Sequence, residues 1–176
     1  DVNVGINGID ETAVMKRCVD ALSGVGLPLV IDSSKVETIE AALKAYDGKA
    51  LVNSVSGKEE SLDKVLPTAA RYGAAVIGLC LDDGGVPSSA QERVKIAEKI
   101  IARAQSAGIR KEDIYIDTLT MAEGAGRGNA NAAIEALETV REKGVKTVLG
   151  VSNISFGMPD REDVNAAFYH RCKDAG

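Results

Sequence analysis

Near the middle of the chain lies an uncharged run, Ala74-Ala75-Val76-Ile77-Gly78-Leu79-Cys80-Leu81. A strand with one face in water alternates apolar and polar residues, whereas a strand covered on both faces is apolar almost throughout. Strands of the second kind are typical of parallel sheets, because the helices that connect parallel strands cover the sheet. We therefore predict a buried parallel strand over residues 75–81.

Five further strands are expected on either side of this run. They are predicted at Asp1–Val4, Leu29–Asp32, Ala50–Val55, Ile114–Asp117 and Thr147–Asn153. Between the strands, apolar residues recur every three or four positions, as in Val36, Ile39 and Leu43, which predicts helices with one face on a core. Strict alternation of strand and helix implies a parallel sheet with right-handed crossovers.

Local signals mark where the helices begin and end. Three S-x-x-E pairs predict capping boxes, namely Ser34 with Glu37, Ser56 with Glu59 and Ser89 with Glu92. Three glycines are expected just after helix ends, at Gly73, Gly108 and Gly144. Asp160, within Pro159-Asp160-Arg161, is expected to cap a last helix.

Composition excludes several classes of function. The net charge is −5, aromatic residues make up 3% of the chain and Trp is absent, so the basic patches and stacking platforms of nucleic-acid binding are missing. No apolar run approaches the ~20 residues of a membrane span, and no secretory signal is present. We expect a cytoplasmic protein. Its three separated cysteines are expected to be buried apolar residues, and with a single His no metal site is predicted.

Polar side chains stand where four of the predicted strands end. They are Asp32, Asn53, Asp117 and Asn153, and a fifth strand carries Asn3. The carboxyl ends of parallel strands form the ligand sites of α/β proteins. One such residue alone is more often part of a turn or a helix cap, but four together favour a binding site.

The chemistry of this set favours recognition of a flat ring. Carboxylates accept paired N–H groups and amides both donate and accept, which suits a heterocycle such as an aminopyrimidinone. No lysine lies on a predicted strand, so a Schiff-base aldolase is poorly supported. The glycine-rich stretch 124–128 follows its strand by several residues and lacks the full spacing of a phosphate loop, so we expect a flexible loop there.

Five segments together resemble the pterin-binding family. They are Asp1–Gly5, Ile31–Ser33, Val52–Ser54, Ile116–Asp117 and Gly150-Val151-Ser152-Asn153-Ile154-Ser155-Phe156-Gly157-Met158-Pro159-Asp160-Arg161. Within that family the chain resembles the methyltetrahydrofolate:corrinoid methyltransferases and the folate domain of cobalamin-dependent methionine synthase. Dihydropteroate synthase, which shares the fold, is a poorer match to the last and longest segment.

The resemblance implies a TIM (β/α)8 barrel of the dihydropteroate synthase-like type. Such a barrel takes about 250 residues, so residues 1–176 are expected to form a fragment of a pterin-binding barrel domain. The fragment holds about six βα units, with the first and last strands of the family missing. Because such a sheet has exposed edges, self-association as a homodimer is also expected.

The resemblance also implies an activity and a role for each site residue. The substrate is methyltetrahydrofolate, whose N5-methyl group passes to the cobalt of a corrinoid (cobalamin) supplied by a partner domain or protein, with no metal bound by this chain. Asp32, Asn53 and Asp117 would hydrogen-bond the pterin ring. Asn153 would contact N5 as the catalytic residue, Arg161 would flank the site, and Asn3 would contribute to binding.

Two alternatives stay open at this stage. The first is a dihydropteroate synthase-like condensation of a pterin diphosphate with an aryl amine. It requires an anion site lined by Lys and Arg on the late strands, for which Arg161 is the one candidate. The second is a folate-binding subunit that keeps the barrel without turnover.

Overall fold

A computed structural model describes all 176 residues. Its centre is one six-stranded sheet whose strands lie in sequence order, β1-β2-β3-β4-β5-β6, and every neighbouring pair is parallel. The strands are β1 (Val2–Asn3), β2 (Val30–Asp32), β3 (Leu51–Ser56), β4 (Ala75–Leu79), β5 (Ile114–Asp117) and β6 (Lys146–Val148). The predicted parallel α/β sheet is confirmed.

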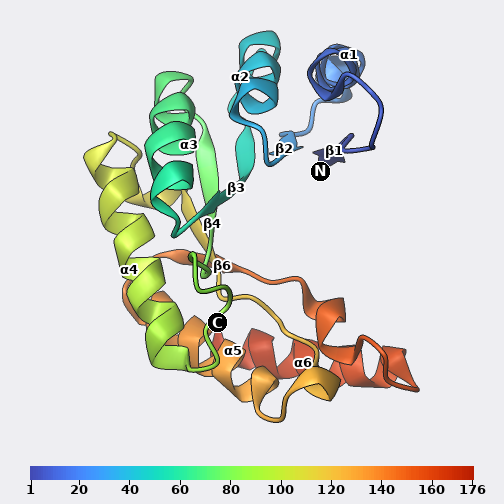
Figure 1. The fold of residues 1–176 in the computed structure, drawn as a ribbon, viewed down its shortest axis with the longest axis vertical. Helices are drawn as coiled ribbons and strands as arrows, with labels where there is room; N and C mark the ends of the chain where they lie inside the picture. Colours follow the sequence, from blue (N-terminus) through green and yellow to red (C-terminus); the bar gives the residue numbers. More distant parts are fainter.

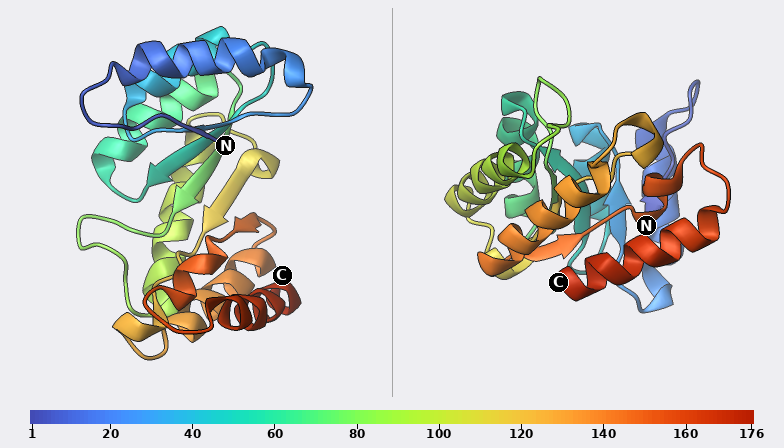
Figure 2. Two further views of the ribbon diagram at one scale, coloured as in Figure 1. Left: turned by 90° about the vertical axis from the view of Figure 1, so that its right-hand side faces the viewer. Right: turned by 90° about the horizontal axis from the view of Figure 1, so that it is seen from below.

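Each strand is followed by a helix, and the helices form an arc along the outer side of the sheet (Figure 1). They are α1 (Glu11–Leu22), α2 (Val36–Ala45), α3 (Glu59–Arg71), α4 (Ala90–Ser106), α5 (Asn129–Glu142) and α6 (Arg161–Ala175). Figure 2 shows α1 and α6 at opposite ends of this arc. The strands β1 and β6 do not pair with each other, so the six βα units form an open, incomplete barrel, as predicted.

The main core lies between the sheet and its helices. In β5, Ile114 and Ile116 are fully buried in that core, whereas Tyr115 and Asp117 are only partly buried. Successive side chains of a strand point to opposite faces, so Tyr115 and Asp117 lie on the concave face, away from the helices. The same alternation buries Ile31 in β2 and places Asp32 on the concave face.

A second, smaller core lies at the C-terminal end of the arc. It joins α5 and α6 to the short 3-10 helix η4 (Val151–Ser155), with Phe168 and Ile154 among its buried residues. The cysteines pack as predicted for apolar residues, because Cys80 and Cys172 are buried and Cys18 is partly buried against the main core. No helix in the chain combines the length and apolar character that a membrane span requires.

Four strands are shorter than the sequence predicts: β1 and β2 by one or two residues, and β4 and β6 at their C-terminal ends. β6 ends at Val148 rather than at residue 153, and residues 151–155 form η4 instead. The reason is local hydrogen bonding, since the N–H groups of Val151 and Asn153 donate to Leu149 and Gly150 rather than to a neighbouring strand. β4 ends at Leu79 because the N–H of Leu81 turns back to the carbonyl of Leu79.

Of the three predicted capping boxes, one is present in part. Ser89 is the N-cap of α4, and its hydroxyl accepts from the N–H of Glu92. The Glu92 carboxylate, however, accepts the Ser89 hydroxyl at 2.8 Å rather than the Ser89 backbone N–H. The other two are wrong: Ser34 and Ser56 do not occupy the N-cap positions, which belong to Lys35 and Lys58. Ser56 is instead the last residue of β3.

The remaining helix signals have mixed outcomes. Asp160 is the N-cap residue of α6, as predicted, although its side chain makes no capping hydrogen bond. The glycines predicted after helix ends are confirmed, with positive φ angles at Gly73, Gly108 and Gly144. These left-handed positions suit glycine because it has no Cβ to clash with the backbone.

The contact between α4 and β4 depends on the absence of a side chain at Gly78. A Cβ atom built there would lie 2.7 Å from Cγ2 of Ile100 and 3.1 Å from Cδ1 of Ile116. Both isoleucines are fully buried. The helix can therefore approach the strand closely only because residue 78 is glycine.

We expect Gly78→Ala to lower the free energy of unfolding by about 1–3 kcal/mol, because it overpacks this contact. Urea denaturation would measure the loss. Gly24→Ala is the control, since a Cβ at residue 24 meets no atom within 4 Å. If the two variants are equally stable, the close packing of α4 on β4 does not limit stability.

Candidate functional site

Three of the predicted site residues stand side by side on the concave face. Asn3 is in register with Asp32, and Asp32 is in register with Asn53. The side-chain amide of Asn3 donates to Oδ2 of Asp32 at 2.9 Å, and that of Asn53 donates to Oδ2 of Asp1 at 3.2 Å. The other carboxylate oxygen of Asp32 has no hydrogen-bond partner within the chain. This row therefore offers acceptors and an amide to a ligand.

A polar hollow of about 630 Å³ adjoins this row, and both Asp32 and Asn53 line it. Its walls come from β3, from the loop after β2 and the start of α2, from the first turns of α3, and from the end of β4. Five serines line it, namely Ser33, Ser34, Ser54, Ser56 and Ser61. Asn3, Asp117, Asn153 and Arg161 do not line it. The hollow thus joins two of the six predicted residues.

Asp117 ends β5 on the same concave face, but further along the sheet. Asn53 is in register with Ile77, whereas Asp117 is in register with Leu79, two residues later on β4. Oδ1 of Asp117 accepts the N–H of Leu119 at 2.7 Å. Burial raises the pKa of Asp117 to about 6, although the Leu119 hydrogen bond and the charge of Arg93 oppose that rise. Asp117 is therefore mostly ionised at neutral pH and mostly protonated below about pH 6.

Asn153 lies on η4 and is exposed. Arg161 holds this short helix in place, since its guanidinium donates to the Ser155 hydroxyl and to the Ser152 carbonyl, each at 3.0 Å. The guanidinium also lies 5.8 Å from the ring centre of the exposed Phe156. Arg161 therefore contacts the segment that carries Asn153.

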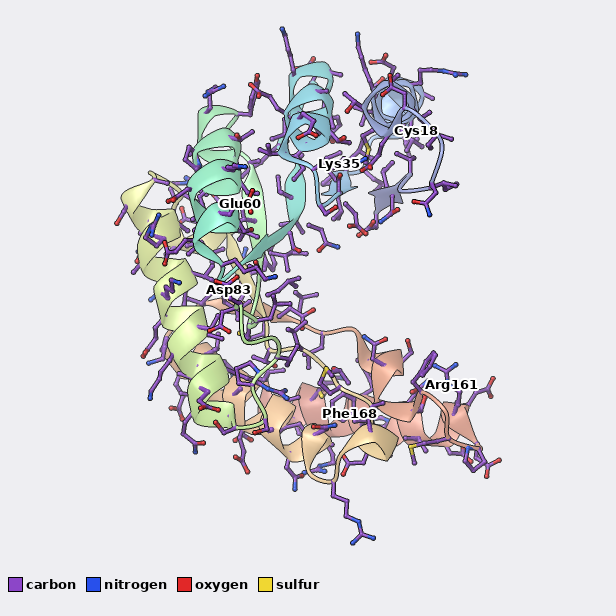
Figure 3. All side chains as sticks on the ribbon, in the orientation of Figure 1. Cys18, Lys35, Glu60, Asp83, Arg161 and Phe168 are labelled. Atoms are coloured by element: carbon purple, nitrogen blue, oxygen red, sulfur yellow. The ribbon has the colours of Figure 1, made fainter.

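The predicted residues are divided between two arms of the arc. No hydrogen bond joins Asn153 or Arg161 to Asp32, Asn53 or Asp117. In Figure 3, Lys35 marks the arm formed with α1 and α2, and Arg161 marks the arm that contains α6. The two arms are joined along the sheet by the pairing of β5 with β6, in which Asp117 is in register with Val148.

Sequence reasoning missed a cluster behind Asp32, in which Glu11 and Ser33 are buried and Lys35 is exposed. Glu11, the first residue of α1, accepts the Ser33 hydroxyl at 2.5 Å and the Lys35 ammonium at 2.9 Å. These two interactions, with the Ser33 hydrogen bond the larger, lower the pKa of Glu11. Ser33 in turn accepts the N–H of Lys35. The cluster fixes the loop that directly follows Asp32.

A second missed residue is Arg93, which is 1% exposed. The signal was present in the sequence, because Arg93 occupies a position in the apolar stripe formed by Ala90, Ala97 and Ile100 of α4. Glu11 likewise stands one helical turn before the buried Met15 of α1. A charged residue on the buried face of a helix indicates an internal polar contact.

The backbone amides of the glycine-rich loop after β5 are bound by a carboxylate from the same loop. The Glu123 carboxylate accepts the N–H of Gly128 at 2.7 Å and the N–H of Ala130 at 2.9 Å. These backbone hydrogen bonds, the one from Ala130 first, lower the pKa of Glu123. The amides that a phosphate would contact at the start of α5 are therefore already bound.

Cys80 lies beside Asp117, because its N–H donates to the Asp117 carbonyl at 3.0 Å. Burial, together with the negative charge of Asp117, raises the pKa of the Cys80 thiol to about 12. The thiolate is the nucleophilic form of cysteine, so Cys80 is unreactive at neutral pH. Cys80, which is fully buried in the main core, is therefore not a candidate nucleophile.

Comparison with curated proteins finds similarity to two methionine synthases. The chain is 35% identical over 191 aligned positions to that of Mycobacterium tuberculosis (strain ATCC 25618 / H37Rv), covering 100% of this chain and 16% of the relative. It is 34% identical to that of Mycobacterium leprae (strain TN), covering 98% of this chain and 15% of the relative. The chain thus spans about a sixth of the length of these relatives.

Among solved structures, the fold resembles dihydropteroate synthases. The TM-score to the enzyme (FolP) from Thermus thermophilus is 0.74 at 22% identity, covering 96% of this chain and 70% of that one. The Yersinia pestis enzyme with a pterine-sulfa conjugate gives a TM-score of 0.74 at 17% identity, covering 98% and 69%. At these identities the likeness shows the fold alone.

A family model described as "Pterin binding enzyme" matches residues 1–176, which is the entire chain. That match agrees with the curated relatives and with the incomplete barrel of the structure. The resemblance predicted from the strand-end segments is therefore confirmed. This chain belongs to the pterin-binding enzyme family.

Proposed function

We propose that this chain binds methyltetrahydrofolate on the concave face and transfers its N5-methyl group to a corrinoid carried by a partner domain or protein. The main support is the row of Asn3, Asp32 and Asn53 on neighbouring strands, beside a polar hollow. The similarity to methionine synthases, at 34–35% identity, favours methyl transfer over other chemistry on a pterin.

In this proposal the pterin ring is held by its hydrogen-bonding edge. The oxygen of Asp32 that Asn3 leaves unpaired would accept an N–H group of the ring, and Asn53 would supply a further amide contact. Asp117 would accept another N–H through the oxygen that Leu119 does not use. Because these groups are fixed by the sheet, they orient the ring with little loss of side-chain freedom.

The methyl group of methyltetrahydrofolate is attached to a tertiary amine, which leaves readily only when protonation makes it cationic. The corrinoid supplies the nucleophile that takes the methyl group. The role of Asn153 is to hydrogen-bond N5, with a bond that strengthens as N5 gains its proton. Arg161 flanks the site and holds the η4 segment that presents Asn153. A bound ring would have to contact both arms of the arc.

A dihydropteroate synthase-like condensation is less well supported. It needs an anion site, and the candidate for it was Arg161. The guanidinium of Arg161 is already bonded to Ser152 and Ser155, and it stacks near Phe156. Methyl transfer to reduced cobalamin, followed by absorbance, separates this alternative and a non-catalytic folate-binding role from the proposed activity.

We expect Asn153→Ala to lower the turnover of methyl transfer roughly 100-fold while changing folate affinity far less, because the hydrogen bond matters most in the transition state. Turnover is measured with reduced cobalamin, and affinity by calorimetry. Ser152→Ala is the matched control, since the Ser152 side chain makes no hydrogen bond. Equal losses of turnover and affinity in Asn153→Ala would contradict the role assigned to Asn153.

We expect folate affinity to fall as the pH drops through about 6, because Asp117 then takes up a proton and loses an acceptor. Calorimetry between about pH 5 and 8 would record the change, and Asp117→Asn should bind weakly with no transition near pH 6. A pH-independent affinity in the unaltered protein would show that the Asp117 carboxylate does not contact the substrate.

The same ionisation has a readout that needs no ligand. Because folding raises the pKa of Asp117, the folded state binds this proton more tightly than the unfolded state. The contribution of Asp117 to stability is therefore present below about pH 4 and is lost as the pH rises through about 6. The melting temperature of Asp117→Asn should lack this component.

A further inference from the structure

Arg93 is a buried positive charge without an ion-pair partner. Its side chain is 1% exposed, and no carboxylate lies within ion-pair distance of it. Instead its guanidinium donates to three backbone carbonyls, those of Pro87 at 2.8 Å, Thr118 at 3.1 Å and Leu119 at 2.8 Å. Burying a charge is unfavourable, and a Met or Leu would fill this position of α4 more easily. The contacts made by Arg93 therefore call for an explanation beyond packing.

Two of these carbonyls belong to the loop that directly follows Asp117. Leu119 has a φ angle of 63°, a left-handed conformation that is rare for a residue with a branched side chain. In this conformation the Leu119 N–H points back and donates to Oδ1 of Asp117 at 2.7 Å. The Thr118 hydroxyl ties the same loop to the carbonyl of Ala133 on α5. The guanidinium thus holds the turn that fixes the orientation of the Asp117 carboxylate.

Arg93 also supplies the positive charge near Asp117. Cys80, which directly follows β4, is a neutral thiol, and the register partners of Asp117 are Leu79 on β4 and Val148 on β6. From α5, the Ala133 backbone carbonyl accepts the Thr118 hydroxyl and brings no charge near Asp117. α4 itself packs outside β4 and β5 (Figure 1). The cation therefore acts on Asp117 from the helix side, while the carboxylate lies on the concave side.

We propose that Arg93 is a positioning residue for Asp117, which shapes the turn at Thr118 and Leu119 and favours the ionised carboxylate. Arg93 would not touch the substrate. The part of this inference that concerns folate binding depends on the proposed function, but the coupling between Arg93 and Asp117 does not. Consistent with it, the charge of Arg93 opposes the rise of the Asp117 pKa that burial causes.

The test is a titration of the Asp117 carboxyl carbon by NMR in the unliganded protein, with Asp117→Asn to assign the signal. Arg93→Met removes the charge and all three hydrogen bonds, and should raise the titration midpoint by about 1 unit or more. Folate affinity in this variant should be reduced at pH 7 and recover at higher pH. Arg93→Lys keeps the charge but cannot span three carbonyls, so the Asp117 midpoint should stay near that of the unaltered protein while folate affinity falls at every pH.

Ile100→Ala is the control. Ile100 is also fully buried on α4, but its apolar side chain forms no hydrogen bond to the loop after Asp117. It should reduce stability without moving the midpoint. If Arg93→Met moves the midpoint no more than Ile100→Ala does, Arg93 is merely structural and the inference is wrong. Should Arg93→Met fail to fold, Arg93→Gln, which keeps donors without the charge, replaces it under the same criterion. A failure of the unaltered protein to bind folate would count against the proposed function, and the titration would still judge the inference.

Discussion

The parallel hydrogen-bonded ladder is the constraint on which the rest of the structure depends. It places residues of neighbouring strands in register, so that Asn3, Asp32 and Asn53 form one row although they are far apart in the sequence. Because side chains alternate along each strand, the residue before each of these three points to the other face and is buried against the helices. Any shift by one residue would move the polar row into the apolar core, which is why the register is strongly specified.

The loops that follow these strands are held from behind by charged residues of the helices. Glu11 of α1 binds the loop after β2, Arg93 of α4 binds the loop after β5, and Arg161 of α6 binds η4 after β6. In each case a backbone segment next to a predicted site residue is anchored by a rigid helix. Fixed loops let short polar side chains act as oriented donors and acceptors, which recognition of a flat ring requires.

The family and the fold carry different kinds of information about function. Dihydropteroate synthases and this chain share a barrel architecture at about 20% identity, and one fold can host different reactions. The closer similarity to methionine synthases concerns a segment that is a small part of those proteins. The proposed pterin site therefore rests on its own side chains, an acidic and amide row on one arm and an exposed amide on the other, whereas the choice of methyl transfer rests on the similarity to methionine synthases.

Sequence alone determined the alternation of strands and helices, the parallel sheet, the family and the strand-end positions of Asp32 and Asp117. These features follow from local periodicity and from motifs that can be identified in one sequence. Asn53, also predicted at a strand end, lies within β3 instead. The sequence placed two helix starts and one strand end incorrectly. The N-caps of α2 and α3 are lysines rather than Ser34 and Ser56, and β6 stops where Val151 and Asn153 form local hydrogen bonds.

The partners of buried charges were decided only in three dimensions. Glu11 and Arg93 were visible as charged residues on apolar helix faces, but what they bind lies 22 and 25 residues away in the chain. The pKa of Asp117 likewise depends on burial and on Arg93, neither of which has a local signature. Such contacts form because packing brings distant segments together in a region where water cannot replace a missing hydrogen bond.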